Sequence, residues 1–159
     1  MLTDAQINDL LSMPKHVENP GAKTRTEGKH IRRDFRVKST DGQHEFALFY
    51  RQSLVMPDSF STGLRWMARG GEPVMLICCN GAGHPHSNAI EGERLEFVRH
   101  IHIATERYLA AGKKEEGYAE PTNDYITVDG ALDCLVRRCN ITGLNTKADS
   151  PDLFTGLLT

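Results

Sequence analysis

Hydrophobic and polar residues alternate along several segments of the chain, and this two-residue period predicts β-strands. The period is clearest in residues 30–39, where Ile31, Phe35 and Val37 share one side and basic residues crowd the other. It returns in residues 45–51, 60–69 and 98–104, while residues 74–79 are apolar throughout, which is typical of a central strand. Because short turns join these segments, we expect an antiparallel meander of about five strands within residues 30–108.

Helix caps and helical spacing appear near both ends of the chain. Thr3 to Gln6 fits a capping box, so a helix is expected within residues 1–14, and Pro14 should end it. Asp129 can cap a second helix over residues 128–140, where apolar residues recur at helical spacing. The predicted fold class is therefore α+β, with an N-terminal and a C-terminal helix packed on the sheet.

The segments between these elements contain turn signals or are polar. Asp41-Gly42 supplies the positive φ angles of a tight hairpin turn. Residues 15–29 and 111–123 are interpreted as irregular loops. Residues 144–159 are expected to form a tail or a short helix that begins at Pro151. All of these segments are assigned to one domain over residues 1–159.

The composition is ordinary for one globular domain, with 39% hydrophobic and 25% charged residues. We find neither a membrane-spanning run nor a signal peptide, so a cytoplasmic location without a membrane partner is expected. The four cysteines form no Cys-x-x-Cys motif and are predicted to be reduced and buried. A formal net charge of -2 argues against strong non-specific DNA binding, although it is compatible with a local basic face.

Four of the seven histidines lie between residues 80 and 107 as two His-x-His pairs. His84 and His86 follow a glycine-bearing turn, whereas His100 and His102 alternate with isoleucines on a predicted strand. Side chains two residues apart on a strand share a face, so His100 and His102 should point the same way. If the flanking strands are neighbours, all four imidazoles gather at one end of the sheet.

This histidine pattern predicts a metal-independent ribonuclease. One neutral imidazole would take the proton of a ribose 2′-hydroxyl while a protonated one gives a proton to the leaving 5′-oxygen, and the unperturbed histidine pKa of about 6.5 suits both roles. We assign His100 and His102 to these roles, assisted by His84 or His86, and Arg107 to transition-state stabilisation. The RNA backbone would lie on four basic residues of the predicted strands: Arg32, Arg36, Lys38 and Arg65.

Two other interpretations stay open. In the first, a divalent ion such as zinc or iron is bound by imidazole and carboxylate ligands from His84, His86, Glu91, His100 and His102. In the second, the protein is a non-enzymatic binding or inhibitor protein, and its histidines form a structural network. Without a metal, no cofactor is expected. The remaining histidines, His16, His30 and His44, are interpreted as surface or turn positions without a role, and Trp66 as a core residue.

The order of these motifs resembles a family of small uncharacterised bacterial proteins. The likeness rests on Phe60-Ser61, Asn80-Gly81, the two His-x-His pairs and the ending Tyr118-Ala119-Glu120-Pro121, followed by Cys139-Asn140-Ile141. The middle third is more distantly similar to the TumE-like toxins of bacterial toxin-antitoxin pairs. Those toxins have an arginine just before the histidine loop, where this chain has Cys78, Cys79 and Asn80. The resemblance implies a mobile-element or toxin-like context. The predicted partners are RNA, a cognate antitoxin or another protein, and a second copy of the chain.

Overall fold

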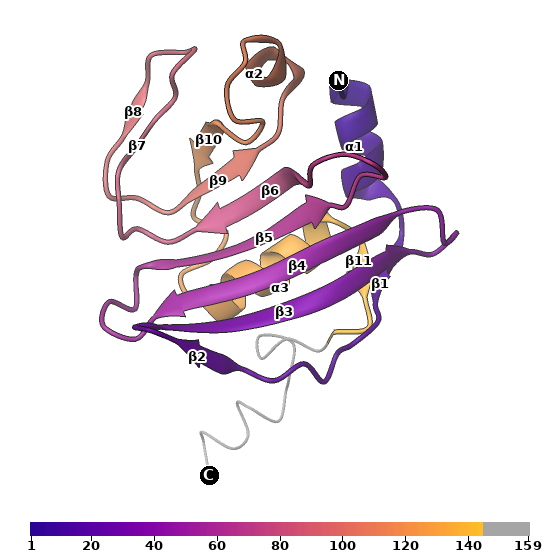
Figure 1. Ribbon diagram of the computed structural model, residues 1–159. Helices are drawn as coiled ribbons and strands as arrows, with labels where there is room; N and C mark the ends of the chain where they lie inside the picture. Colours follow the sequence, from indigo (N-terminus) through magenta and orange to yellow (C-terminus); the bar gives the residue numbers. More distant parts are fainter. Residues whose placement is uncertain (145–159) are drawn as a thin grey trace.

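The computed structural model describes residues 1–144, which form a strongly curved sheet with helices at one face and one end (Figure 1). Six antiparallel strands make up most of the sheet: β3 (His30–Ser39), β4 (Glu45–Ser53), β5 (Phe60–Trp66), β6 (Val74–Asn80), β9 (His100–Ile103) and, at one edge, β10 (Tyr118–Pro121). They pair antiparallel in this order, so the five strands predicted within residues 30–108 are neighbours in chain order. A two-stranded hairpin of β7 (His86–Ser87) and β8 (Arg94–Leu95) is inserted between β6 and β9.

The sheet is larger than predicted and is not a strict meander. Within residues 1–144 it has nine strands rather than about five. The polar segment 15–29, predicted to be irregular, contains β1 (Lys15–Val17) and β2 (Arg25–Glu27), both paired with β3. Strand β11 (Ile141–Thr142) joins β1 in parallel, and the predicted loop 111–123 supplies β10 at the other edge. These additional strands are two to four residues long, which is too short for a sequence period to reveal.

Helices lie near both ends of the described residues, where the sequence predicts them. Helix α1 (Asp4–Ser12) begins with the predicted capping box between Thr3 and Gln6. Helix α3 (Val128–Arg138) is also present, but its N-cap is Thr127, whose hydroxyl accepts from the Gly130 amide, rather than Asp129. A short helix, α2 (Glu106–Ala110), follows β9. The predicted tail or helix at 144–159 falls, after Leu144, outside the described residues.

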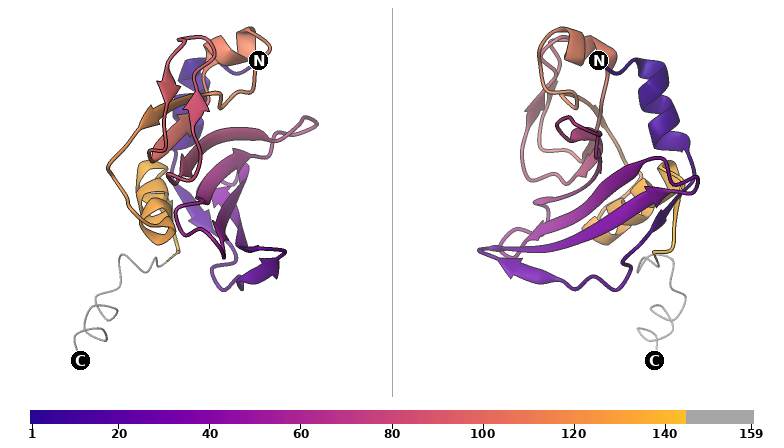
Figure 2. Two further views of the ribbon diagram at one scale, coloured as in Figure 1. Left: turned by 90° about the vertical axis from the view of Figure 1, so that its left-hand side faces the viewer. Right: turned by 45° about the vertical axis from the view of Figure 1, so that its right-hand side comes forward.

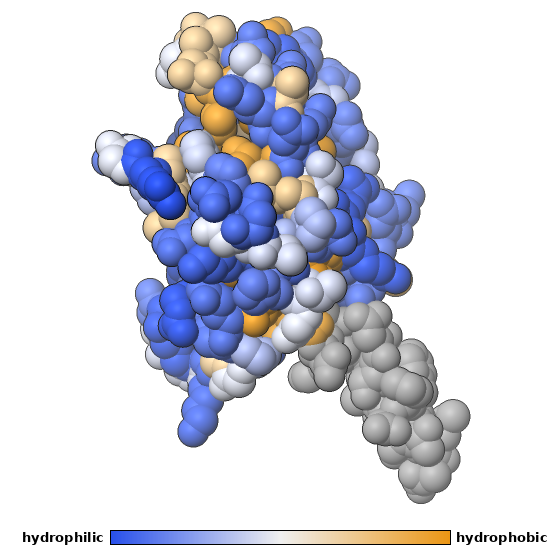
Figure 3. Space-filling model, turned by 90° about the vertical axis from the view of Figure 1, so that its right-hand side faces the viewer, coloured by the Kyte–Doolittle hydropathy of each residue, from blue (hydrophilic) through white to orange (hydrophobic). Residues whose placement is uncertain are grey.

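Helix α3 covers one face of the sheet and contacts β4, β5 and β6 (Figure 2). Its buried side chains, including Ala131, Leu132 and Leu135, pack on the inward residues of these strands, such as Leu48 and Leu64. All four cysteines are buried and free, as predicted. Figure 3 shows that the side bearing α1 is mostly hydrophilic, with its apolar residues in small separate patches. Among residues 1–144, no helix is long and apolar enough to cross a membrane.

A buried lysine joins the two main helices. Lys15 is only 1% exposed. Its ammonium donates, at 2.8–2.9 Å, to the carbonyls of Leu11 in the last turn of α1, of Met13 at its C-cap and of Cys139 at the C-cap of α3. Burial lowers the pKa of Lys15 to about 8, which leaves the amine mostly protonated at neutral pH. One side chain therefore satisfies carbonyls that the two helix ends leave without an intrahelical partner.

We expect Lys15→Met to lower the free energy of unfolding by about 2 kcal/mol, because it leaves buried carbonyls without a donor. Urea denaturation at pH 7 measures this change. The control is Lys23→Met, which removes an exposed amine and should leave the midpoint unchanged. Equal midpoints for the two variants would contradict the role of Lys15.

Candidate functional site

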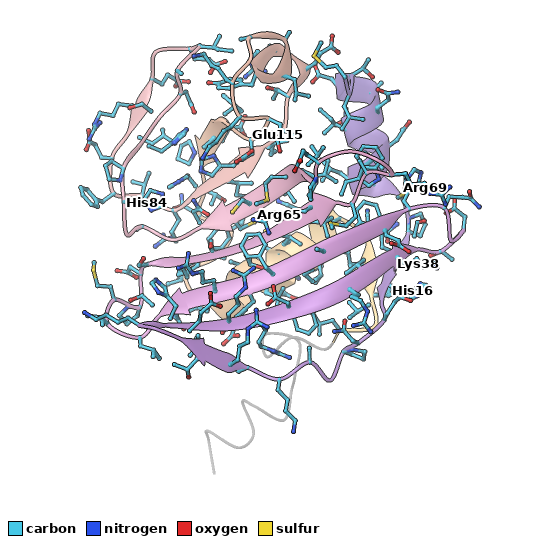
Figure 4. The ribbon with its side chains drawn as sticks, in the orientation of Figure 1. His16, Lys38, Arg65, Arg69, His84 and Glu115 are labelled. Carbon is cyan, nitrogen blue, oxygen red and sulfur yellow. The ribbon has the colours of Figure 1, made fainter. Side chains whose placement is uncertain are left out.

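The face of the sheet opposite α3 carries no helix within residues 1–144 and is turned toward the viewer in Figure 4. Strand register places one polar row across this uncovered face, in which Arg32 pairs with Arg51, Arg51 with Ser61, Ser61 with Asn80, and Asn80 with His100. The adjacent row runs from Asp34 through Phe49, Gly63 and Cys78 to His102. The uncovered face therefore links the basic strands to the histidine strand.

All four basic residues predicted to bind nucleic acid lie on the uncovered face: Arg32, Arg36, Lys38 and Arg65. The guanidinium carbons of Arg32 and Arg65 stand 5.8 and 4.8 Å from the centroid of the Phe49 ring. Phe49 lies flat on β5 because its neighbour is Gly63, where a Cβ would be only 2.6 Å from the ring. The Phe49 ring is thus buried on a polar face beneath two arginines. Cation–π contact with this ring keeps the two guanidinium groups in place.

The four predicted histidines come together at the β6–β9 end of this face. The ring centroids of His86 and His102 are 4.6 Å apart, those of His100 and His102 5.0 Å, and those of His84 and His100 5.2 Å. His86 also stacks on His100 at 5.8 Å. His100 is fully buried and His102 is 9% exposed, whereas His84 is exposed and labelled at one end of the face in Figure 4.

Backbone carbonyls fix the orientation of the two buried rings. Nδ1 of His100 lies 2.8 Å from the Val98 carbonyl oxygen, and Nδ1 of His102 lies 2.8 Å from that of Glu116. A carbonyl can only accept, so each Nδ1 carries the proton and each neutral ring keeps an acceptor at Nε2. The Asn80 amide donates to Nε2 of His100 at 3.4 Å, and the Cys78 thiol donates to the Asn80 oxygen at 3.1 Å.

This environment favours uncharged groups. Burial, followed by the neighbouring imidazoles, lowers the pKa of His102 to about 4, and burial is also the main cause of the lowered pKa of His100. Burial raises the pKa of the Cys78 thiol to about 12, so this thiol keeps the proton that it donates to Asn80. At neutral pH, His100 and His102 are therefore neutral imidazoles that supply rigidity and hydrogen-bond acceptors but no charge.

Two side chains that the sequence did not single out hold this end of the sheet together. Asn88 is 1% exposed and exchanges two hydrogen bonds of 2.9 Å with the backbone of Ala119, and its oxygen also accepts from His86 at 3.1 Å. The Tyr125 hydroxyl lies 2.8 and 3.0 Å from the carbonyl oxygens of Asn80 and His100, and it donates its proton to this pair. No residue spacing marks either contact, because both partners are distant in sequence.

A pocket of about 310 Å³ opens beside the cluster, where β3, β4 and the loop after β6 meet. Its polar lining consists of His30, Arg51, Ser59, Ser61, Asn80 and His84. The loop after β6 packs closely on residues 58–60, since a Cβ at Gly81 would overlap the Asp58 carbonyl and one at Gly83 would be 2.9 Å from the Ser59 Cα. The glycines of the predicted turn therefore bring His84 against the β4–β5 loop.

Two predicted site residues have other partners. Arg107 forms an ion pair of 2.7 Å with Glu91 and lies over the rings of Tyr108 and Tyr118, while Glu91 also accepts from the Tyr108 hydroxyl. This pair is separate from the imidazole contacts, so the structure does not bring Arg107 or Glu91 to the histidines. Among residues 1–144, no three histidine, cysteine or carboxylate side chains are placed to share a metal ion.

The fold and site define an α+β protein whose sheet has one covered face and one basic, uncovered face that ends at four clustered histidines. The chain belongs to a family of unknown function, DUF6978, whose model matches residues 2–142. No curated protein and no solved structure matches it. Membership of an uncharacterised family is thus confirmed, whereas the likeness to TumE-like toxins stays a prediction.

The buried histidines predict a loss of stability in acid. His102 has a lower pKa in the folded chain, about 4, than the unperturbed value of about 6.5, so the unfolded chain binds more protons between these values. Its contribution is complete above pH 6.5 and is lost as the pH falls toward 4, and it amounts to about 3 kcal/mol.

Urea midpoints from pH 7 to pH 4 measure this loss. His102→Gln should flatten the dependence, whereas His16→Gln, at an exposed position of β1, should leave it unchanged. An identical pH dependence in wild type and His102→Gln would contradict the assignment.

Proposed function

We propose that the protein binds single-stranded RNA along the uncovered face of its sheet. The observation that carries this proposal is the placement of the cations on a single face that no helix covers within residues 1–144. By strand register the cations of β2 to β5 on this face are Arg25, Arg32, Arg36, Lys38, Arg51 and Arg65, against the carboxylates of Glu27, Asp34 and Glu45.

The charge on this face is available to a ligand. Asp34 engages Arg25 and Arg32, but Arg36, Lys38 and Arg51 pair with no carboxylate of residues 1–144. The whole chain has a formal charge of -2, so the positive potential is concentrated locally instead of being spread over the surface. A phosphate backbone is the polyanion that such a stripe of guanidinium and ammonium groups attracts.

The shape of the face favours a single strand over a duplex. A major groove admits a helix or a two-stranded ribbon, whereas unpaired bases stack on planar side chains that stand on a sheet. Arg32 and Arg65, which lie over the Phe49 ring, offer such planes, because guanidinium groups stack on bases as well as contact phosphates. A single strand can lie along the polar row from Arg32 to His100.

In this proposal the buried histidines support the site. His100 and His102 are buried and neutral and are bonded to backbone carbonyls, so they form a rigid wall at the end of the binding face. RNA cleavage needs a protonated imidazole, and neither His100 nor His102 supplies one readily. This geometry favours a positioning role for His100 and His102 over the acid–base role predicted for them. The toxin-like context and a cognate antitoxin stay predictions.

We expect the double variant Arg36→Gln/Lys38→Gln to weaken binding of a single-stranded RNA oligonucleotide about tenfold. Loss of two phosphate contacts should also reduce the slope of log K against log salt concentration by about 1.4, since each contact on a single strand contributes about 0.7. Fluorescence anisotropy between 50 and 200 mM salt, roughly the range in which such slopes are measured, gives both quantities.

The matched control is Arg138→Gln, which removes a partly exposed arginine on α3, behind the sheet. It should leave affinity and slope unchanged. An equal effect of the two changes, or no RNA binding by the wild-type chain, would refute the proposal. A DNA oligonucleotide of the same sequence measures how much of the binding depends on the 2′-hydroxyl.

A further inference from the structure

The pocket at the end of the uncovered face contains two accessible imidazoles and an unpaired guanidinium. The buried rings of His100 and His102 offer no such accessible groups. His84 is exposed, His30 is partly exposed, and Arg51 is exposed and has no ion-pair partner within residues 1–144. The three side chains come from β3, β4 and the loop after β6, and they line one cavity of about 310 Å³. The sequence predicts no role for His30 and does not single out Arg51.

We propose that His30 and His84 form the acid–base pair of an RNA-cleaving site and that Arg51 binds the scissile phosphate. This inference rests on the proposed RNA binding, because the pocket continues the polar row on which the strand would lie. Arg51 belongs to that row, paired with Arg32 on one side and Ser61 on the other. A phosphate of an RNA backbone that lies along this row therefore reaches Arg51 at the cavity that the two histidines also line.

The reaction needs only the substrate and these side chains. One imidazole, neutral at the start, takes the proton of the ribose 2′-hydroxyl, and the 2′-oxygen forms a bond to phosphorus. The bond from phosphorus to the 5′-oxygen breaks, and that oxygen takes a proton from the other imidazole, which starts protonated. The products are a 2′,3′-cyclic phosphate and a 5′-hydroxyl. The guanidinium of Arg51 stabilises the charge that develops on the phosphoryl oxygens.

Burial favours the pocket histidines, His30 and His84, over the buried His100 and His102 as proton-transfer groups. A proton-transfer group must come within hydrogen-bond distance of the substrate, and fully buried His100 cannot do so while Asn80 occupies its Nε2. His84 instead stands edge-on to His100, with the ring centroids 5.2 Å apart and the planes at 82°. The buried ring thus orients the exposed one, and the close packing of Gly83 on Ser59 fixes the loop that carries it.

The pocket also indicates the substrate class. Small-molecule sites begin at about 300 Å³, so this cavity has room for one nucleotide unit and not for a base pair with both backbones. Serine hydroxyls at Ser59 and Ser61 and the Asn80 amide line the cavity beside the charged groups. The inferred substrate is an unpaired ribonucleotide within a single strand, recognised through its phosphate and its 2′-hydroxyl.

The test uses the full chain and a fluorescent DNA oligonucleotide that contains one ribonucleotide, with an all-DNA oligonucleotide as control, in buffer with EDTA. We expect cleavage only at the ribonucleotide and a cyclic phosphate product by mass spectrometry. His30→Gln and His84→Gln should each reduce the cleavage rate at least about a hundredfold, within the range for loss of one proton-transfer group. Both variants should retain RNA binding and the wild-type urea midpoint.

The control is His16→Gln, which lies at the far end of the same face beside Lys38, well away from His84 (Figure 4). It should cleave at the wild-type rate. RNA binding without any cleavage by the wild-type chain would overturn this inference and leave the binding proposal intact, whereas absence of binding and cleavage would overturn both. Cleavage that survives in His30→Gln and His84→Gln but is lost in His102→Gln would overturn the inference and assign the acid–base role to the buried histidines.

Discussion

The packing of α3 against one face of the sheet is the interaction on which the rest of the structure depends. It buries alternate residues of β4, β5 and β6, such as Leu48, Leu64 and Ile77, and so assigns the intervening residues to the opposite face. Because side chains alternate between faces, the packing of α3 on one face places four polar residues together on the other: Arg51, Ser61, Asn80 and His100. The uncovered polar face is therefore determined by the core. A shift of one strand by one residue would bury the polar side chains of that strand and expose its apolar ones.

Four imidazoles can share a small volume only if they need not be charged together. The structure meets this condition by giving the inner rings carbonyl acceptors at Nδ1 and by withdrawing them from water, and burial then lowers their pKa. His86 is held in the same way, since its Nε2 lies 2.8 Å from the Gly117 carbonyl oxygen. His100 and His102 are thus rigid and neutral, whereas His84 is exposed. The cluster of four histidines thus contains rings that are fixed by backbone carbonyls and one ring that is exposed.

The sequence predicts the parts of this arrangement that depend on local pattern. The period of two places Arg32, Arg36 and Lys38 on one face, and the capping box at Thr3 marks the start of α1, both as observed. It also indicates that the two His-x-His pairs meet, because neighbouring strands are joined by one loop. The sequence does not predict β1, β2, β10 and β11, which are defined by pairing with distant partners and are too short to show a period. Asn88, Tyr125 and Lys15 act through backbone carbonyls, which a pattern of side chains cannot reveal.

The same distinction explains why the sequence does not single out His30 as a pocket residue. A lone histidine at the start of a strand has no neighbour in sequence that indicates chemistry, and its partners in the pocket come from residues 51 and 84. The two His-x-His pairs, by contrast, are recognisable in the sequence because their members are only two residues apart. On a central strand, however, this spacing places both rings in a buried position. Strand β9 lies between β6 and β10, so its uncovered-face side chains are enclosed by both neighbours and by the hairpin that Asn88 ties to β10. The proposed proton exchange with RNA instead needs accessible imidazoles, and the strand ends beside the basic strands carry His30, Arg51 and His84 around one pocket.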